Sequence, residues 1–78
     1  MNDWSREDEI AMERRHILEG EQLLAKQQAL IGKLISGGHH GLVETASELL
    51  GILRDSVDLS RARLRELEHL LRERQKSN

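Results

Sequence analysis

The sequence has no cysteine and no proline, and its only aromatic side chain is Trp4. The absence of cysteine excludes a disulfide-stapled scaffold and any metal site built from thiolates. The absence of proline removes the residue that most strongly interrupts a helix. A chain of 78 residues lies at the size where one core supplies only about 3–5 kcal/mol of net stability. Since a disulfide is excluded, we expect an oligomer to supply the rest.

A basic excess and a long apolar run are also missing. Lysine and arginine number 12 against 14 acidic residues, a net charge of −2, whereas proteins that bind polyanions normally carry a clear basic excess. No apolar run approaches the roughly 18–20 residues of a membrane span. The first residues, Met1 to Trp4, lack the basic and apolar regions of a signal peptide. We therefore expect a cytoplasmic protein without a membrane segment and do not favour nucleic acid as its ligand.

What remains is a sequence rich in leucine and in charge, with 33% charged residues and apolar residues at a seven-residue spacing. This pattern is typical of long helices. The one interruption is the stretch Ser36–Gly41, which holds three of the six glycines. We predict an all-α fold, an antiparallel helical hairpin in a single domain over 1–78, with helices at about 5–36 and 42–75 and a turn at 37–41.

The first helix is predicted to begin near Ser5, since serine is a good N-cap and Asp8 completes a capping box. Gly20 is unfavourable inside a helix by about 1 kcal/mol, so its presence indicates the close approach of another helix. Gln27 is expected to be a partly buried polar residue that fixes the register. Trp4 is expected to pack against the far end of the second helix. The predicted packing residues of this helix are Ile10, Ile17, Gly20, Leu24, Gln27, Ile31 and Leu34.

The second helix is predicted to begin at Gly41 or Leu42 and to end near Gln75. A strict seven-residue repeat over this length favours a left-handed supercoil against a partner helix, as in a coiled coil. Small residues at Ala46 and Ser60 suggest places where the helices lie close together. The predicted packing residues of this helix are Val43, Leu50, Leu53, Val57, Leu64, Leu67 and Leu71.

Reversal of the chain at the glycine-rich stretch pairs the two helices in opposite directions. The distance of each residue from the turn then predicts its neighbour on the other helix. The expected pairs are Leu34 with Val43, Gln27 with Leu50 or Leu53, Gly20 with Val57, and Ile10 with Leu67.

Several apolar residues lie beside this predicted seam and would stay exposed in an isolated hairpin. Two hairpins packed together would cover them and form a four-helix bundle. We therefore predict a homodimer, and a different helical partner is the main alternative. These residues are Leu18 and Ile35 in the first helix and Leu42, Leu49, Ile52, Leu59 and Leu70 in the second.

The run His16-Ile17-Leu18-Glu19-Gly20 resembles the His-x-Leu-Lys-Gly motif of histidine phosphotransfer domains, which are helical bundles with an exposed phosphorylatable histidine. The resemblance implies a phosphoryl-accepting role for His16, with Gly20 clearing space for a partner. Glu19 stands where the family has lysine, and a carboxylate there would repel a phosphohistidine. The favoured interpretation is that His16 flanks the seam and that Gly20 serves helix packing.

Other candidate sites are weaker. His39 and His40 are adjacent in the turn, and adjacent residues seldom ligate one ion well. The stretch from Glu13 to His16 has the Glu-x-x-His spacing of carboxylate-bridged metal bundles, but only once and only on the first helix. No nucleophile, base and orienting group occur together. We predict no catalytic residues, no metal and no cofactor, hence a protein that is not an enzyme.

A row of arginines follows one side of the second helix. The architecture is similar to that of the plasmid copy-number regulator Rop, a hairpin dimer that binds RNA, although no sequence motif is shared. Asp58 interrupts the row and can pair with Arg61 or Arg65, so we favour a solvated, ion-paired face over an RNA-binding one. The row consists of Arg54, Arg61, Arg65 and Arg72.

The chain also resembles, over most of the first helix, the turn and half of the second helix, a group of small alphaproteobacterial proteins without an assigned activity. The resemblance implies a bacterial cytoplasmic protein. After His39 the group tends to have an Asp or Thr cap, whereas this chain has His40-Gly41. The matching residues are His16 to Glu21, Gln27, Leu30, Ile31, Leu34, Gly38, His39, Leu49, Leu50 and Leu53.

Together these patterns favour a small dimeric adaptor or regulator that acts through protein–protein contacts. An RNA-binding bundle is the first alternative. A degenerate phosphotransfer module that uses His16 is the second.

Overall fold

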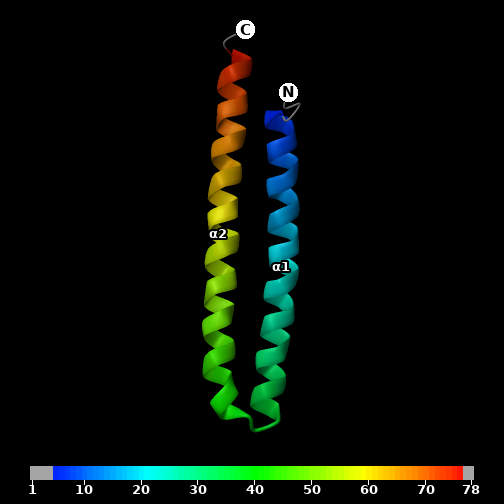
Figure 1. Cartoon of the computed structure of the whole chain (residues 1–78), viewed down its shortest axis with the longest axis vertical. Helices are drawn as coiled ribbons and strands as arrows, with labels where there is room; N and C mark the ends of the chain where they lie inside the picture. Colours follow the sequence, from blue (N-terminus) through cyan, green and yellow to red (C-terminus); the bar gives the residue numbers. More distant parts are fainter. Residues whose placement is uncertain (1–4, 77–78) are drawn as a thin grey trace.

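Two long helices lie side by side and are joined by a short turn (Figure 1). The computed structural model describes residues 5–76, so Trp4 and its expected contact lie outside the described residues. Helix α1 spans Arg6–Ser36 and helix α2 spans His40–Lys76. The molecule measures 61 × 22 × 16 Å along its principal axes. The all-α hairpin predicted from the sequence is confirmed.

The beginning of α1 is held by a capping box. The amide of Asp8 donates to Ser5 Oγ at 3.2 Å, and the amide of Ser5 donates to Asp8 Oδ2 at 3.1 Å. Each bond satisfies a backbone N–H that would otherwise have no partner at the helix end. The first turn also carries Glu7, Asp8 and Glu9, whose charges are favourable beside the positive end of the helix dipole. The predicted N-cap at Ser5 is therefore confirmed.

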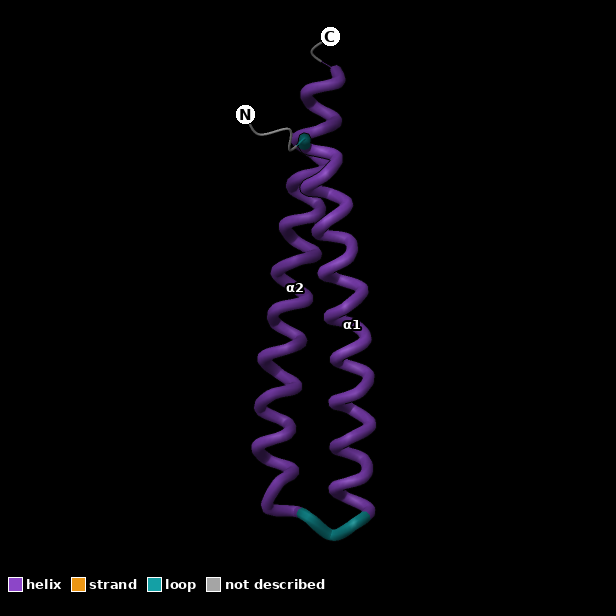
Figure 2. The backbone as a smooth tube through the Cα atoms, turned by 45° about the vertical axis from the view of Figure 1, so that its right-hand side comes forward, coloured by secondary structure: helices purple, strands orange, loops and turns teal. Residues whose placement is uncertain are grey.

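A short loop joins the two helices at the tip (Figure 2). Its backbone hydrogen bonds form a Schellman motif. The amide of His39 donates to the carbonyl of Leu34 at 2.8 Å, and the amide of Gly38 donates to that of Ile35 at 3.1 Å. These two bonds satisfy two carbonyls in the last turn of α1. Gly38 has a φ of +76°, a conformation in which a side chain would be strained. The left-handed exit from the helix that the glycines predict occurs at this residue.

Helix α2 begins at His40, earlier than the expected start at Gly41 or Leu42. The reason lies in the backbone of the turn. The Schellman motif completes the reversal by His39, and the carbonyl of His39 already accepts from the amide of Leu42 at 3.0 Å. The turn is therefore shorter than the expected 37–41, and α2 ends at Lys76.

The core is a narrow seam between the two helices. Among residues 5–76 the buried apolar side chains are Ile10, Ala46, Val57 and Leu67, and Glu13 is the buried charged side chain. The seam is narrow because each helix is covered on one side only. The other predicted packing residues are half-buried: Ile17, Gly20, Leu24, Gln27, Ile31, Leu34, Val43, Leu50, Leu53, Leu64 and Leu71.

Neither helix, within the described range, has an apolar stretch long enough to cross a bilayer.

Candidate interaction surface

The two helices lie close together at Gly20. A Cβ atom added to Gly20 would lie 2.6 Å from Cγ2 of Val57, well inside van der Waals contact. Val57 is one of the most buried residues, with 3% of its surface exposed. The glycine therefore lets the valine seat against the backbone of α1. Both the close approach at Gly20 and its pairing with Val57 agree with the sequence-based expectation.

Gln27 crosses the seam one heptad nearer the tip. Its Nε2 donates to the backbone carbonyl of Ala46 at 2.9 Å, whereas the sequence predicts Leu50 or Leu53 as its neighbour. The difference arises because a helix carbonyl points toward the C-terminal end of its helix. The oxygen of Ala46 therefore lies level with the next turn of α2. The small side chain of Ala46 leaves this oxygen accessible to Gln27.

Glu13 lies in the seam one heptad before Gly20, with 5% of its surface exposed. Its Oε2 lies 3.8 Å from Nη1 of Arg63, an arginine whose side chain is 68% exposed. Its other oxygen, Oε1, is buried without a hydrogen-bond partner. Burial of a carboxylate with so little compensation is unfavourable. The seven-residue spacing places Glu13 in line with Gly20 and Gln27, but the sequence does not predict its burial.

One edge of the seam is crossed by two ion pairs that join the helices. Nη2 of Arg14 lies 2.9 Å from Oε2 of Glu68, and Nη2 of Arg61 lies 2.8 Å from Oε2 of Glu21. Arg61 also lies 3.5 Å from Asp58, the pair that the sequence suggests. We call the side formed by Arg14, Glu21, Arg61 and Glu68 the ion-paired edge.

Among the described residues between Gly20 and the tip, the other edge of the seam carries no ion pair between the helices. Farther from the tip, Arg63, which follows Ser56 by seven residues, lies 3.8 Å from Glu13. Leu23 and Leu30 follow Gly20 and Gln27 by three residues and so lie about 60° to one side of them on the helix. Glu21, by contrast, follows Gly20 by one residue and lies about 100° to the other side. We call the opposite side the open edge; it consists of His16, Leu23 and Leu30 on α1 and Leu42, Leu49 and Ser56 on α2.

The half of the open edge nearest the tip is a shallow apolar groove of about 360 Å³. The three leucines at its rim are exposed to a similar degree: Leu30 to 44%, Leu42 to 57% and Leu49 to 46%. Side chains of this size gain about 1.5–3 kcal/mol each when fully buried. The groove is lined by Gln27, Leu30, Leu34, Leu42, Thr45, Ala46 and Leu49.

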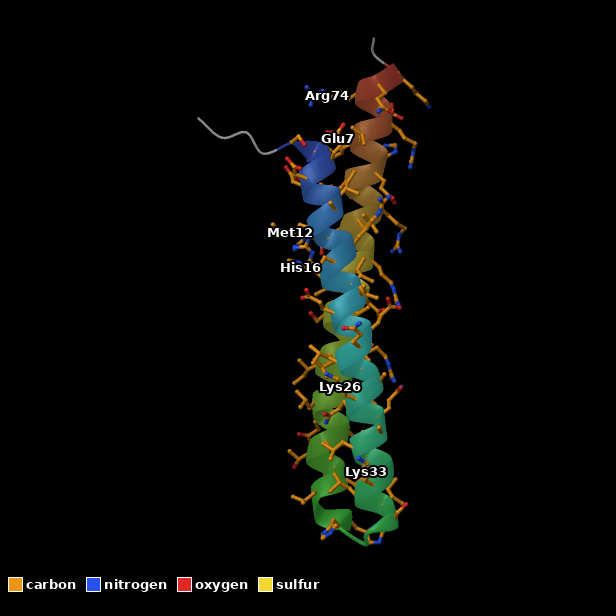
Figure 3. All side chains as sticks on the ribbon, turned by 90° about the vertical axis from the view of Figure 1, so that its right-hand side faces the viewer. Glu7, Met12, His16, Lys26, Lys33 and Arg74 are labelled. Carbon is orange, nitrogen blue, oxygen red and sulfur yellow. The ribbon has the colours of Figure 1, made fainter. Side chains whose placement is uncertain are left out.

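The half of the open edge farther from the tip is more polar. His16 is exposed there and extends to the same side of α1 as Met12 (Figure 3). Glu19 lines the same hollow of about 250 Å³, so a carboxylate lies beside the imidazole. This placement is unfavourable for an added phosphoryl charge. The hollow is lined by His16, Glu19, Gly20, Leu23, Leu53, Ser56, Val57 and Ser60.

The two histidines of the turn, His39 and His40, differ in their placement. A Cβ atom on Gly37 would lie 2.9 Å from Cδ2 of His39, so the imidazole folds back over the turn, and His40 is exposed in the first turn of α2. The two residues with the Glu-x-x-His spacing lie in different places, since Glu13 is buried in the seam and His16 lies on the open edge. Within residues 5–76, no three His, Asp or Glu side chains are grouped as a metal ion would require.

The ion-paired edge is the feature that the sequence-based interpretation missed. Its signal is present in the spacing. On α1, Arg14 and Glu21 are seven residues apart and so occupy the same heptad position. On α2, the same holds for Arg61 and Glu68. Opposite charges at equivalent positions of two antiparallel helices indicate ion pairs between them.

Comparisons with protein-family models, with curated proteins and with solved structures found no match to this chain. The resemblance to small alphaproteobacterial proteins therefore stays a prediction.

Proposed function

We propose that this protein is a non-enzymatic helical hairpin that forms a homodimer, as a four-helix bundle, and acts in the bacterial cytoplasm as a small adaptor or regulator through protein contacts. The observation that carries the proposal is the open edge. A row of half-exposed leucines borders the seam there (Leu23, Leu30, Leu42 and Leu49). Rows of this kind are used for helix-to-helix association.

The narrow core supports the same proposal. Among residues 5–76, four apolar residues are buried, Ile10, Ala46, Val57 and Leu67. These and the half-buried residues of the seam must compensate the ordering of two long helices. Fixing the backbone of one residue costs about 1–2 kcal/mol, whereas full burial of one large apolar side chain returns about 1.5–3 kcal/mol. A second hairpin would bury the half-exposed residues and correct this imbalance.

The RNA-binding alternative is less favoured by the contacts of the arginine row. Arg61 is engaged by both Glu21 and Asp58, so part of its charge is compensated within the hairpin. The chain also carries a net charge of −2. The phosphotransfer alternative is less favoured because Glu19 shares the hollow that contains His16.

Light scattering on the purified protein at micromolar concentration tests the proposal. We expect a helical species of twice the chain mass of 9.0 kDa. A stable, fully helical monomer would contradict the homodimer. Affinity capture from a bacterial lysate would then identify protein partners of the assembled form.

Two further assays separate the alternatives. RNA binding that weakens by about 10³-fold or more between 50 and 200 mM salt would favour the RNA-binding bundle. Phosphoryl transfer to the wild-type protein, lost in His16→Gln, would favour the phosphotransfer module. We expect neither result.

A further inference from the structure

We propose that the open edge is the face on which the second copy of the chain packs and that the ion-paired edge remains on the outside of the dimer. This inference rests on the homodimer proposed above and adds the location of its interface. It follows from the exposed area of the hairpin, from the difference between its two edges and from the charges that flank the open edge.

The isolated hairpin exposes more surface than a compact monomer of the same mass. Its accessible area is 6108 Å², whereas a folded monomer of 9.0 kDa exposes about 4,850 Å². The excess is therefore about 1,250 Å². A standard protein–protein interface removes about 800 Å² from each partner, so one interface with a second copy would use most of the excess.

The two edges differ in what they would lose to a covering partner. At the ion-paired edge, Arg14 with Glu68 and Arg61 with Glu21 already satisfy one another, and their side chains are 31–62% exposed. Covering them would remove water from four charged groups, which is unfavourable. In the half of the open edge nearest the tip, Leu30 and Leu49 would instead lose contact with water, which is favourable. The difference between these two desolvation free energies favours the open edge as the interface.

The flanks of the open edge fit a second copy of the same chain. Glu19, Lys26 and Lys33 each follow an open-edge residue of α1 by three positions and lie along its outer margin (Lys26 and Lys33 are labelled in Figure 3). This margin therefore carries both signs of charge. In a symmetric dimer the same patch meets itself, so a margin with both signs can place opposite charges across the boundary while leucine meets leucine.

Charge substitutions on the two sides of α1 test the location of the interface. Leu30 on the open edge and Leu18 outside it are exposed to 44% and 58% in the hairpin, so Leu18→Glu is a matched control for Leu30→Glu. An interface at the open edge leaves Leu18 uncovered, unlike the dimer expected from the sequence. We expect Leu30→Glu to raise the dimer dissociation constant by at least about tenfold, because a charge would be buried among leucines. Leu18→Glu should change it by less than about twofold. Sedimentation equilibrium measures both constants, and circular dichroism measures the helical content.

A second measurement avoids variants that dissociate or unfold. Because the chain has no cysteine, Leu30→Cys and Leu18→Cys each introduce a single thiol. We expect maleimide to modify the thiol at position 30 at least about tenfold more slowly than that at 18, since packed interfaces exclude solvent. The same rates measured in urea provide the unfolded reference.

The outcomes distinguish this inference from the proposed homodimer. If the dimer tolerates Leu30→Glu and maleimide modifies both thiols equally fast, the proposed location of the interface is wrong, whereas the proposed homodimer still holds. A wild-type protein that stays monomeric at every concentration would overturn both proposals.

Discussion

At the scale of single residues, the seam is shaped by the residues at every seventh position of α1. Val57 packs against the backbone at Gly20, where an added Cβ atom would lie only 2.6 Å from Cγ2 of Val57. Gln27 donates across the seam to Ala46, and Glu13 is buried with one oxygen unpaired. Gly20 therefore brings the helices together, Gln27 fixes their register and Glu13 weakens their packing.

Substitution of the seam glycine should have the opposite effect to substitution of an outer one. For Gly20→Ala, the clash with Val57 should outweigh the gain in helix propensity, since overpacking costs about 1–3 kcal/mol and the gain is about 1 kcal/mol. For Gly32→Ala nothing lies within 4 Å of the added Cβ, so the free energy of unfolding should rise by about 1 kcal/mol. Urea unfolding followed by circular dichroism measures both.

The clash itself can be tested by a double substitution. If Val57 is the obstacle, Val57→Ala should destabilise the Gly20→Ala protein less than it destabilises the wild type. Equal losses in both backgrounds would show that the valine methyl group is not what Gly20 accommodates.

Replacement of the buried carboxylate should stabilise the protein. We expect Glu13→Leu to raise the free energy of unfolding by about 1–3 kcal/mol, because apolar replacements of buried charges are often stabilising. The charge of Arg63 is not stranded, since its side chain is 68% exposed. Glu21→Leu on the ion-paired edge is the control and should not stabilise. A loss of stability in Glu13→Leu would mean that Glu13 has a partner in the assembled protein.

At the scale of elements, much of the hairpin can be predicted from the sequence. Ser5 and Asp8 predict the beginning of α1, and the glycines of the turn predict its end, because capping depends on local residue chemistry. The beginning of α2 at His40 could not be predicted in the same way. It is determined by backbone bonds of the turn, chiefly His39 to Leu34, which any residue type except proline can make.

Substitution of Gly38 should weaken the turn. Its φ of +76° is unfavourable for a residue with a side chain by about 1–2 kcal/mol, so Gly38→Ala should lower the free energy of unfolding by about that amount. Gly38→Asn should cost less, since asparagine tolerates this conformation better. The matched control is Gly41→Ala, where no atom lies within 4 Å of the added Cβ and the stability should not fall. Equal effects at Gly38 and Gly41 would contradict this role of the turn.

At the scale of the whole molecule, the hairpin has two unlike edges. The sequence predicts the exposed leucines beside the seam, such as Leu42 and Leu49, because their spacing places them there in any long helix. It does not by itself show that Arg14 meets Glu68 and Glu21 meets Arg61. Those pairs depend on how far one helix is displaced along its axis relative to the other, to within one helical turn. The contacts at Gly20 and Gln27 determine this displacement.

The most direct test of the central claim, association of two hairpins into a bundle, is sedimentation equilibrium of the unmodified protein over a range of concentrations, with helical content measured on the same samples. We expect a mass of twice 9.0 kDa at micromolar concentration and a joint loss of mass and helicity on dilution, because association stabilises the folded chain by mass action. A fully helical species of 9.0 kDa at every concentration would contradict it.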